Sequence, residues 1–174
     1  MKFLVSLLSL LLFNGCATKG VDIKTVENVN IEKFMGNWYV LAGRFTFLEK
    51  NVHNGLEKYV WNEEQKRIDV DFTYLQGSFE GPKKSIPQKA WIFNEKTKAH
   101  WKVSPLWPLK FNYLVVALDK DYRWTAIGVP DQAYLWIMAR DWKNADWAID
   151  EALTSLNNIG YNTKNIVRVP HRWP

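Results

Sequence analysis

The chain of 174 residues contains a single cysteine, Cys16. One cysteine cannot form a disulfide within the chain, so disulfides cannot stabilise the fold. An exported protein would carry this lone thiol free in an oxidising compartment unless the thiol were modified. The same scarcity excludes a thiol nucleophile from the rest of the chain, and with it cysteine-dependent catalysis.

Histidine is also scarce, and the three residues His53, His100 and His171 are widely spaced. A haem or zinc site needs inward-facing histidine with defined partners, so we expect no metal and no cofactor. Asp119 and Asp121 are better explained by a hairpin turn, because aspartate favours turns. No G-x-S-x-G motif is present, and we expect a protein that is not an enzyme, although a cavity could still hide a catalytic pair.

Positive charge is present but not concentrated. The net charge is +5, and Lys83-Lys84 is the one pair of adjacent lysines. Nucleic-acid binding would require a basic face on a recognisable module, so we expect no nucleic-acid partner. A mildly basic surface is better suited to anionic lipid.

Long apolar runs are missing too. The longest, Phe3–Phe13, is too short to span a bilayer comfortably. It follows Lys2 and precedes the small residues Gly15 and Cys16, a pattern typical of a secretory signal. We therefore expect a signal peptide at 1–15, a linker at 16–29 and one folded domain at 30–174.

The composition favours a folded domain with a sizeable core. Hydrophobic residues make up 47% of the chain and charged residues 24%. These proportions argue against disorder, and the length is ordinary for one domain. Ten tryptophans can fill much of an interior, provided that each indole N–H finds a partner.

From Gly36 onward the sequence predicts short strands separated by turn signals. The first runs from Gly36 into Val40–Ala42, and Gly77–Pro87 is predicted to be a loop. The other seven predicted strands are Leu56–Trp61, Ile68–Tyr74, Lys89–Phe93, Ala99–Val103, Asn112–Leu118, Trp124–Val129 and Tyr134–Ala139. Close, ordered connections between eight strands favour an antiparallel up-and-down barrel.

Two predicted strands alternate between apolar and polar residues, which indicates one face turned into the barrel. From this alternation we expect five side chains to face the interior and bind ligand: Val70, Phe72, Tyr74, Trp101 and Val103.

The hydrophobic period changes after the last of these strands. Apolar residues at Ile149, Ala152, Leu153, Leu156 and Ile159 follow helical spacing. The sequence therefore predicts one helix over 144–158, stopped by Gly160, and a short ninth strand at 165–169. A short helical turn is also expected within 29–35.

Three short motifs, in order, resemble those of the lipocalins. Gly36-Asn37-Trp38-Tyr39 resembles the first lipocalin motif, and Asp121-Tyr122 the second, with Lys120 where threonine is usual. Arg140, at the end of the last predicted barrel strand, resembles the third. The resemblance covers about residues 30–174 and implies an all-β, eight-stranded antiparallel barrel with one C-terminal helix packed outside. It also implies that Arg140 lies against the Trp38 indole and closes the barrel floor, an arrangement suited to cation–π stacking.

The N-terminal region resembles a bacterial lipoprotein signal. Leu12-Phe13-Asn14-Gly15-Cys16 is similar to a lipobox, in which the cysteine becomes the acylated first residue. The resemblance thus implies lipid attachment at Cys16 and membership of the bacterial outer-membrane lipoprotein branch. Ala17 after the cysteine implies retention at the outer membrane, on its periplasmic side.

A closed eight-stranded barrel leaves room for one small ligand. We expect a fatty acid or a lysophospholipid in the cavity, with the membrane as a second partner through the lipid anchor. The protein is expected to be a monomer or a homodimer. The alternative is an envelope interaction protein whose barrel is filled by its own aromatic side chains and whose outer face binds a partner.

Overall fold

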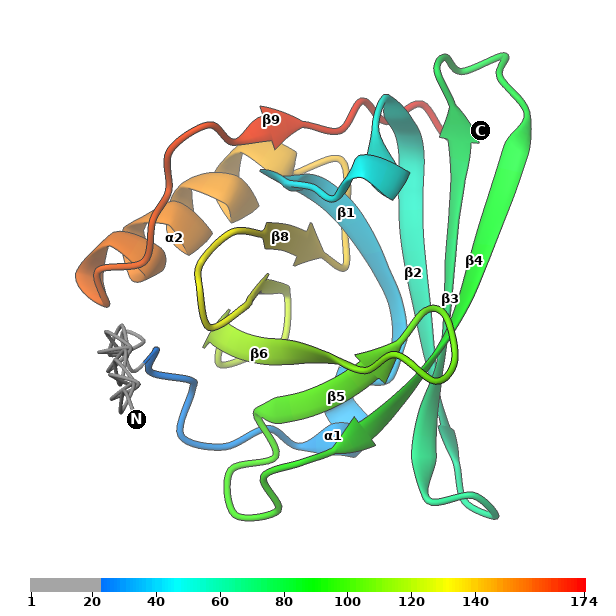
Figure 1. Cartoon of the computed structure of the whole chain (residues 1–174). Helices are drawn as coiled ribbons and strands as arrows, with labels where there is room; N and C mark the ends of the chain where they lie inside the picture. Colours follow the sequence, from blue (N-terminus) through cyan, green and yellow to red (C-terminus); the bar gives the residue numbers. More distant parts are fainter. Residues whose placement is uncertain (1–22) are drawn as a thin grey trace, which may run out of the picture.

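The computed structural model describes residues 23–174 and shows a closed antiparallel barrel with a helix on one side (Figure 1). The barrel strands are β1 (Gly36–Arg44), β2 (Val52–Asn62), β3 (Arg67–Gln76), β4 (Lys83–Ile92), β5 (His100–Ser104), β6 (Phe111–Leu118), β7 (Trp124–Gly128) and β8 (Leu135–Ala139). The remaining elements are α1 (Ile31–Phe34), the 3₁₀ turn η1 (Phe47–Glu49), α2 (Ala145–Asn158) and β9 (Val167–Arg168).

Each strand pairs with its neighbour in sequence, and β1 closes the ring by pairing with both β8 and β2. The predicted eight-stranded up-and-down barrel, with its outer helix and ninth strand, is confirmed. Closure removes free sheet edges, because every barrel strand has a neighbour on both sides over part of its length.

Strand β1 changes partner along its length. Residues Gly36–Tyr39 pair with β2, but further along the strand Ala42 and Gly43 pair with β9 instead. Between these stretches the backbone N–H of Val169 donates to Leu41 O at 2.8 Å, and His171 Nε2 bonds Val40 O, also at 2.8 Å.

Strand β2 holds the same C-terminal segment from the other side, mainly through Asn54. Its backbone N–H donates to Pro170 O at 2.9 Å, and its side-chain amide donates to Arg172 O at 2.8 Å. The Asn54 Oδ1 atom accepts from Arg172 N at 2.7 Å. The segment 167–172 therefore bridges β1 and β2 where the two strands part.

Apolar side chains form two layers, one inside the barrel and one beneath α2. The helix buries Ala148, Ile149, Ala152 and Leu156 against the outer face of the barrel; three of these belong to the predicted stripe, whose Leu153 is half-buried. Ile159 follows the last helical residue and is 39% exposed. The alternation predicted for Ile68–Tyr74 is present, since Ile68, Val70, Phe72 and Tyr74 are all buried.

The predicted loop Gly77–Pro87 is wrong in its second half. Residues 83–87 belong to β4 and pair with β3, with Lys83 opposite Leu75 and Pro87 opposite Asp71. Proline is tolerated there because β4 pairs with β5 only from Lys89 onward, so one side of the strand needs no donor at Pro87.

Part of the predicted linker packs on the barrel. Val26 N donates to Val115 O at 3.0 Å, and Val29 N donates to Thr97 O at 2.8 Å. Val29 is fully buried. Residues before position 30 therefore already contact the barrel. The predicted signal peptide and Cys16 lie outside the described residues. Within 23–174, neither helix has the length and apolar character to cross a membrane.

We predict that Asn54 stabilises the protein by holding the segment 167–172 between β1 and β2. Asn54→Ala removes two side-chain hydrogen bonds and places alanine at a φ of 49°, in the left-handed region. The free energy of unfolding, measured by urea denaturation, should fall by about 2–4 kcal/mol.

Asn51→Ala is the matched control, because Asn51 has a φ of 55° but lies exposed in a turn. It should cost about 1 kcal/mol, from the backbone alone. Equal losses in the two variants would show that the side-chain bonds of Asn54 contribute nothing.

Candidate functional site: the barrel cavity

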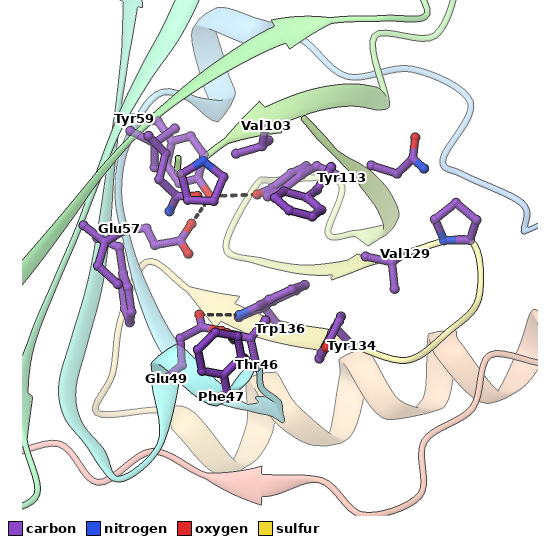
Figure 2. A pocket seen from close by; sticks show the side chains of 18 of the residues that line it. Thr46, Phe47, Glu49, Glu57, Tyr59, Val103, Tyr113, Val129, Tyr134 and Trp136 are labelled. Atoms are coloured by element: carbon purple, nitrogen blue, oxygen red, sulfur yellow. Dashed lines mark hydrogen bonds between the residues drawn. The ribbon is translucent and has the colours of Figure 1, made fainter. Parts of the chain in front are cut away.

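The barrel encloses a cavity of about 460 Å³ that opens between its connecting loops. This volume lies within the range typical of small-molecule sites. Figure 2 shows the side chains around it. The lining residues are Thr46, Phe47, Glu49, Glu57, Tyr59, Val70, Phe72, Ile86, Gln88, Val103, Pro105, Phe111, Asn112, Tyr113, Val129, Pro130, Asp131, Tyr134 and Trp136.

Three of the five residues predicted to bind ligand line this cavity: Val70, Phe72 and Val103. Tyr74 is buried and stacks on Phe72, with ring centroids 5.0 Å apart, but does not line the cavity. Trp101 does not line it either. Alternation along a strand identifies the face that points inward, but not how deep each residue lies.

A chain of hydrogen bonds crosses the lower part of the cavity. The hydroxyl of Tyr59 donates to Glu57 Oε2, and the hydroxyls of Tyr59 and Tyr113 lie 2.7 Å apart. The pKa of Glu57 is raised to about 7, mainly by burial; the hydrogen bond from Tyr59 opposes the rise and the nearby Glu49 adds to it. This shift corresponds to roughly 3 kcal/mol of disfavour for the charged form.

Glu49, from η1, is a second carboxyl in the cavity wall. Its Oε1 atom accepts from the indole N–H of Trp136 at 2.8 Å, and its Oε2 accepts from Thr46 N at 3.1 Å and Thr46 Oγ1 at 2.8 Å. These three donors fix the orientation of the carboxyl. The capping of η1 therefore also positions an acid in the cavity wall.

Neither glutamate was identified from the sequence. In β2 the buried positions include Glu57 and Tyr59, whereas the apolar Val60 is 48% exposed. An inward acid and an outward valine hide the period-2 pattern that marks an inner face. The sequence offers one sign that Glu57 and Tyr59 share the inner face: Lys58, a residue type that is rarely buried, lies between them.

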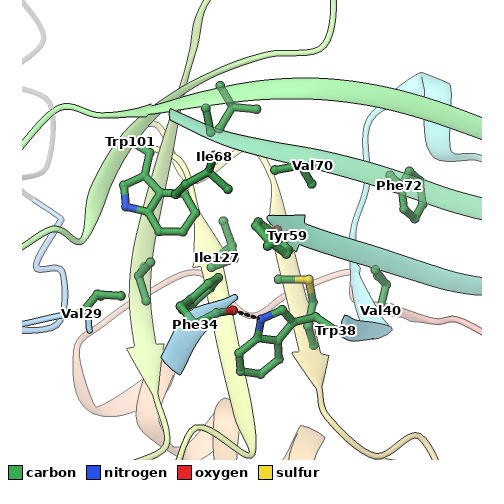
Figure 3. Close-up of a cluster of buried hydrophobic side chains, with 14 of the residues drawn as sticks. Val29, Phe34, Trp38, Val40, Tyr59, Ile68, Val70, Phe72, Trp101 and Ile127 are labelled. Carbon is green, nitrogen blue, oxygen red and sulfur yellow. Dashed lines mark hydrogen bonds between the residues drawn. The ribbon is translucent and has the colours of Figure 1, made fainter. Parts of the chain in front are cut away.

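Aromatic rings fill the closed end beneath the cavity (Figure 3). The Phe34 ring, from α1, lies 5.1 Å from the Trp38 ring, 5.1 Å from the Trp101 ring and 5.5 Å from the Tyr59 ring. Trp101 also stacks on Tyr113 at 5.0 Å, with the planes 4° apart. Trp101 therefore supports the cavity from below.

The N–H groups of both indoles in this floor have hydrogen-bond acceptors. Trp38 Nε1 donates to Phe34 O at 2.8 Å, and Trp101 Nε1 donates to Lys98 O at 2.7 Å. Such partners allow tryptophan to be fully buried without an unpaired donor.

Arg140 covers the floor from outside. Its guanidinium carbon lies 3.7 Å from the centroid of the Trp38 ring. Its two terminal nitrogens donate to four carbonyl oxygens, those of Lys33 (2.8 Å), Phe34 (3.1 Å), Met35 (2.9 Å) and Asn37 (2.7 Å). Burial lowers the pKa of Arg140 to about 10, which leaves it charged at neutral pH.

The other motif residues lie around this closed end. Gly36 has a φ of 97°, which favours glycine, and an added Cβ would meet Arg140 Nη1 at 3.4 Å. The hydroxyl of Tyr122 accepts from Asn30 N at 2.8 Å, just before α1. Asp121 is exposed and pairs with Lys120 at 2.6 Å. Tyr39 lies at the other side of β1, with its ring 5.5 Å from that of Trp173.

The β6–β7 hairpin is organised by Asp119, for which the sequence predicts only a place in the turn. One of its oxygens accepts from Arg123 Nε at 2.8 Å and from the backbone N–H groups of Asp121 and Arg123. These bonds lower the pKa of Asp119 to about 2.

We predict that Trp38 and Arg140 are energetically coupled. Trp38→Ala should cost roughly 3–5 kcal/mol, because it leaves a cavity in a fully buried position. A double-mutant cycle with Arg140→Ala, measured by chemical denaturation, should give a coupling energy of about 1–2 kcal/mol.

Arg172→Ala provides the comparison, because the Arg172 guanidinium lies over the distant Phe79 ring at 4.4 Å. Its effect should add to that of Trp38→Ala within about 0.5 kcal/mol. Additive effects for Arg140 as well would contradict the coupling across the floor.

The comparisons with known proteins agree with this geometry. The family model described as a lipocalin-like domain matches residues 29–171. The outer membrane lipoprotein Blc of Escherichia coli K12 is 30% identical over 155 residues, covering 87% of this chain and 83% of the relative. The protein of the same name from Vibrio cholerae is 25% identical over 173 residues, covering 97% and 98%.

Solved structures share the fold. Insecticyanin from the tobacco hornworm Manduca sexta superposes with a TM-score of 0.64 at 14% identity, covering 86% of this chain and 84% of that one. The names of the curated relatives confirm the expectation of an outer-membrane lipoprotein, and the expectation that the chain is not an enzyme is confirmed by its relatives. The barrel fold, the Trp38–Arg140 floor and the family match all agree. The chain belongs to the lipocalin family, in its bacterial outer-membrane lipoprotein branch.

Proposed function

We propose that the protein binds a lipid with a single hydrocarbon chain, a fatty acid or a lysophospholipid, and stores or carries it at the outer membrane. The observation that carries this proposal is the cavity itself, whose walls include Val70, Phe72, Ile86 and Val103. The alternative requires a barrel filled by its own side chains, and a cavity of about 460 Å³ argues against it.

The energetics favour a long chain. Each buried CH₂ contributes about 0.8 kcal/mol, so a long acyl chain contributes on the order of 10 kcal/mol before losses. Loss of ligand freedom and desolvation of the head group offset much of this gain. Net affinity in the micromolar range or better is the expected outcome.

The loop between β5 and β6 supports exchange of lipid with a membrane. Pro105 and Phe111, at its two ends, line the cavity. Between them Leu106 is 68% exposed and Trp107 67% exposed, and the ammonium of Lys110 lies 5.5 Å from the Trp107 ring. Exposed apolar and aromatic side chains beside a lysine suit contact with a lipid surface.

We predict that affinity depends on chain length. For delipidated protein, each added CH₂ should raise the affinity for a saturated single-chain ligand about fourfold until the cavity is full. Quenching or a shift of indole fluorescence should report binding, because Trp136 lines the cavity.

Phe72→Asp should abolish this binding, because it places an unpaired carboxyl against the hydrocarbon chain. Thr73→Asp is the matched control on the adjacent, outward-facing position of β3, and circular dichroism should show both variants folded. If a folded Phe72→Asp protein binds as tightly as the wild type, the hydrocarbon chain of the ligand does not lie against residue 72. Affinity independent of chain length would favour the partner-binding alternative.

We also propose Cys16 as the attachment site of the anchor. Cys16→Ser should prevent acylation, because the sulfur that carries the lipid is lost, and the protein should move from the membrane fraction to the soluble periplasm. Labelling with an alkyne fatty acid followed by fractionation measures both effects. Wild-type protein that takes no label and is soluble would contradict the anchor.

A further inference from the structure

Among the described residues, every ionisable side chain that lines the cavity is an acid, so none of them carries a positive charge. They comprise Glu49, Glu57 and Asp131, together with the phenols of Tyr59, Tyr113 and Tyr134. Lysine, arginine and histidine are absent from the lining as far as the described residues define it. A bound carboxylate head would therefore lie among acids with no cation to pair with it.

Glu57 is the acid placed best to meet a ligand. It is 6% exposed and lines the cavity, and its one side-chain hydrogen bond within residues 23–174 comes from Tyr59. That bond uses Oε2, which leaves Oε1 for a ligand. The other ionisable groups that influence Glu57 or its partner are Tyr113, from β6, and Glu49, from η1.

The surroundings of Glu57 are rich in aromatic rings. Tyr59, Tyr113 and Trp136 line the same cavity as the carboxyl (Figure 2), and so does Phe72. The faces of such rings attract cations, and aromatic cages with a nearby acid are the usual way in which proteins hold quaternary ammonium groups. Removal from water strengthens this attraction.

We propose that the cavity selects amphiphiles that carry a positively charged nitrogen, held between the carboxyls of Glu57 and Glu49 while the hydrocarbon chain fills the apolar remainder. This inference rests on the proposed function and narrows it to one chemistry of head group. Free fatty acids lack such a nitrogen and would bring a further negative charge.

The affinity for the cation should depend on pH. Glu57 is neutral below its pKa of about 7 and pairs with a cation only when it is ionised. Affinity should therefore rise as the pH increases through about 7, and the bound cation should lower the pKa of Glu57 by stabilising the carboxylate.

The test compares three ligands of equal chain length with delipidated protein at about pH 8: dodecyltrimethylammonium, dodecanol and dodecanoate, each below its micellar concentration. Calorimetry should find the cation bound about tenfold more tightly than dodecanol, and dodecanoate bound more weakly than both. Glu57→Gln should reduce the ratio of cation to dodecanol affinity about tenfold.

Glu64→Gln removes the same charge from the exposed turn after β2 and should leave the ratio unchanged. If Glu57→Gln does not fold, Glu49→Gln should reduce the same ratio severalfold. Dodecanoate binding as tightly as the cation, or an unchanged ratio in the folded glutamate variants, overturns the inference and leaves the proposed function standing. Failure of all three ligands to bind overturns both.

Discussion

The guanidinium of Arg140 is the group on which the closed end of the barrel depends. It stacks on Trp38 and donates to four successive or nearly successive carbonyls between Lys33 and Asn37. Those carbonyls belong to the end of α1 and the start of β1, so one side chain at the end of β8 joins three elements. Because Phe34 and Trp38 are held in this way, the aromatic floor has one arrangement and sets the depth of the cavity above it.

Below this cavity the indoles of Trp38 and Trp101 each donate to a backbone carbonyl, whereas in the cavity itself two carboxyls face a space lined by rings and aliphatic groups. Burying Glu57 costs roughly 3 kcal/mol when it is charged, and among residues 23–174 no cation in the cavity lining offsets that cost. A buried acid of this kind, beside aromatic rings, is consistent with the ammonium-binding site proposed above. The closed end of the barrel is thus filled by packed aromatic rings, whereas two carboxyls line the cavity at the other end.

The sequence predicted the architecture well because the signals were local. The alternation over Ile68–Tyr74 and the helical stripe from Ile149 to Leu156 each follow from the period of one element. Features set by neighbouring strands were missed: Lys83-Lys84 and Pro87 resemble a loop, yet β3 recruits them into β4. Alternation predicts Trp101 in the cavity wall, whereas its ring packs against Phe34 in the floor. Glu57 was overlooked because a buried acid interrupts the very pattern used to find an inner face.

If the barrel holds one single-chain amphiphile, native mass spectrometry of protein purified from its own host should detect the complex. We expect a complex whose added mass is lost on organic extraction and whose extracted lipid has one hydrocarbon chain and a positively charged nitrogen. Protein that carries no lipid before extraction, and takes up none when the extract of the host membrane is returned to it, would show that the barrel does not hold such a lipid.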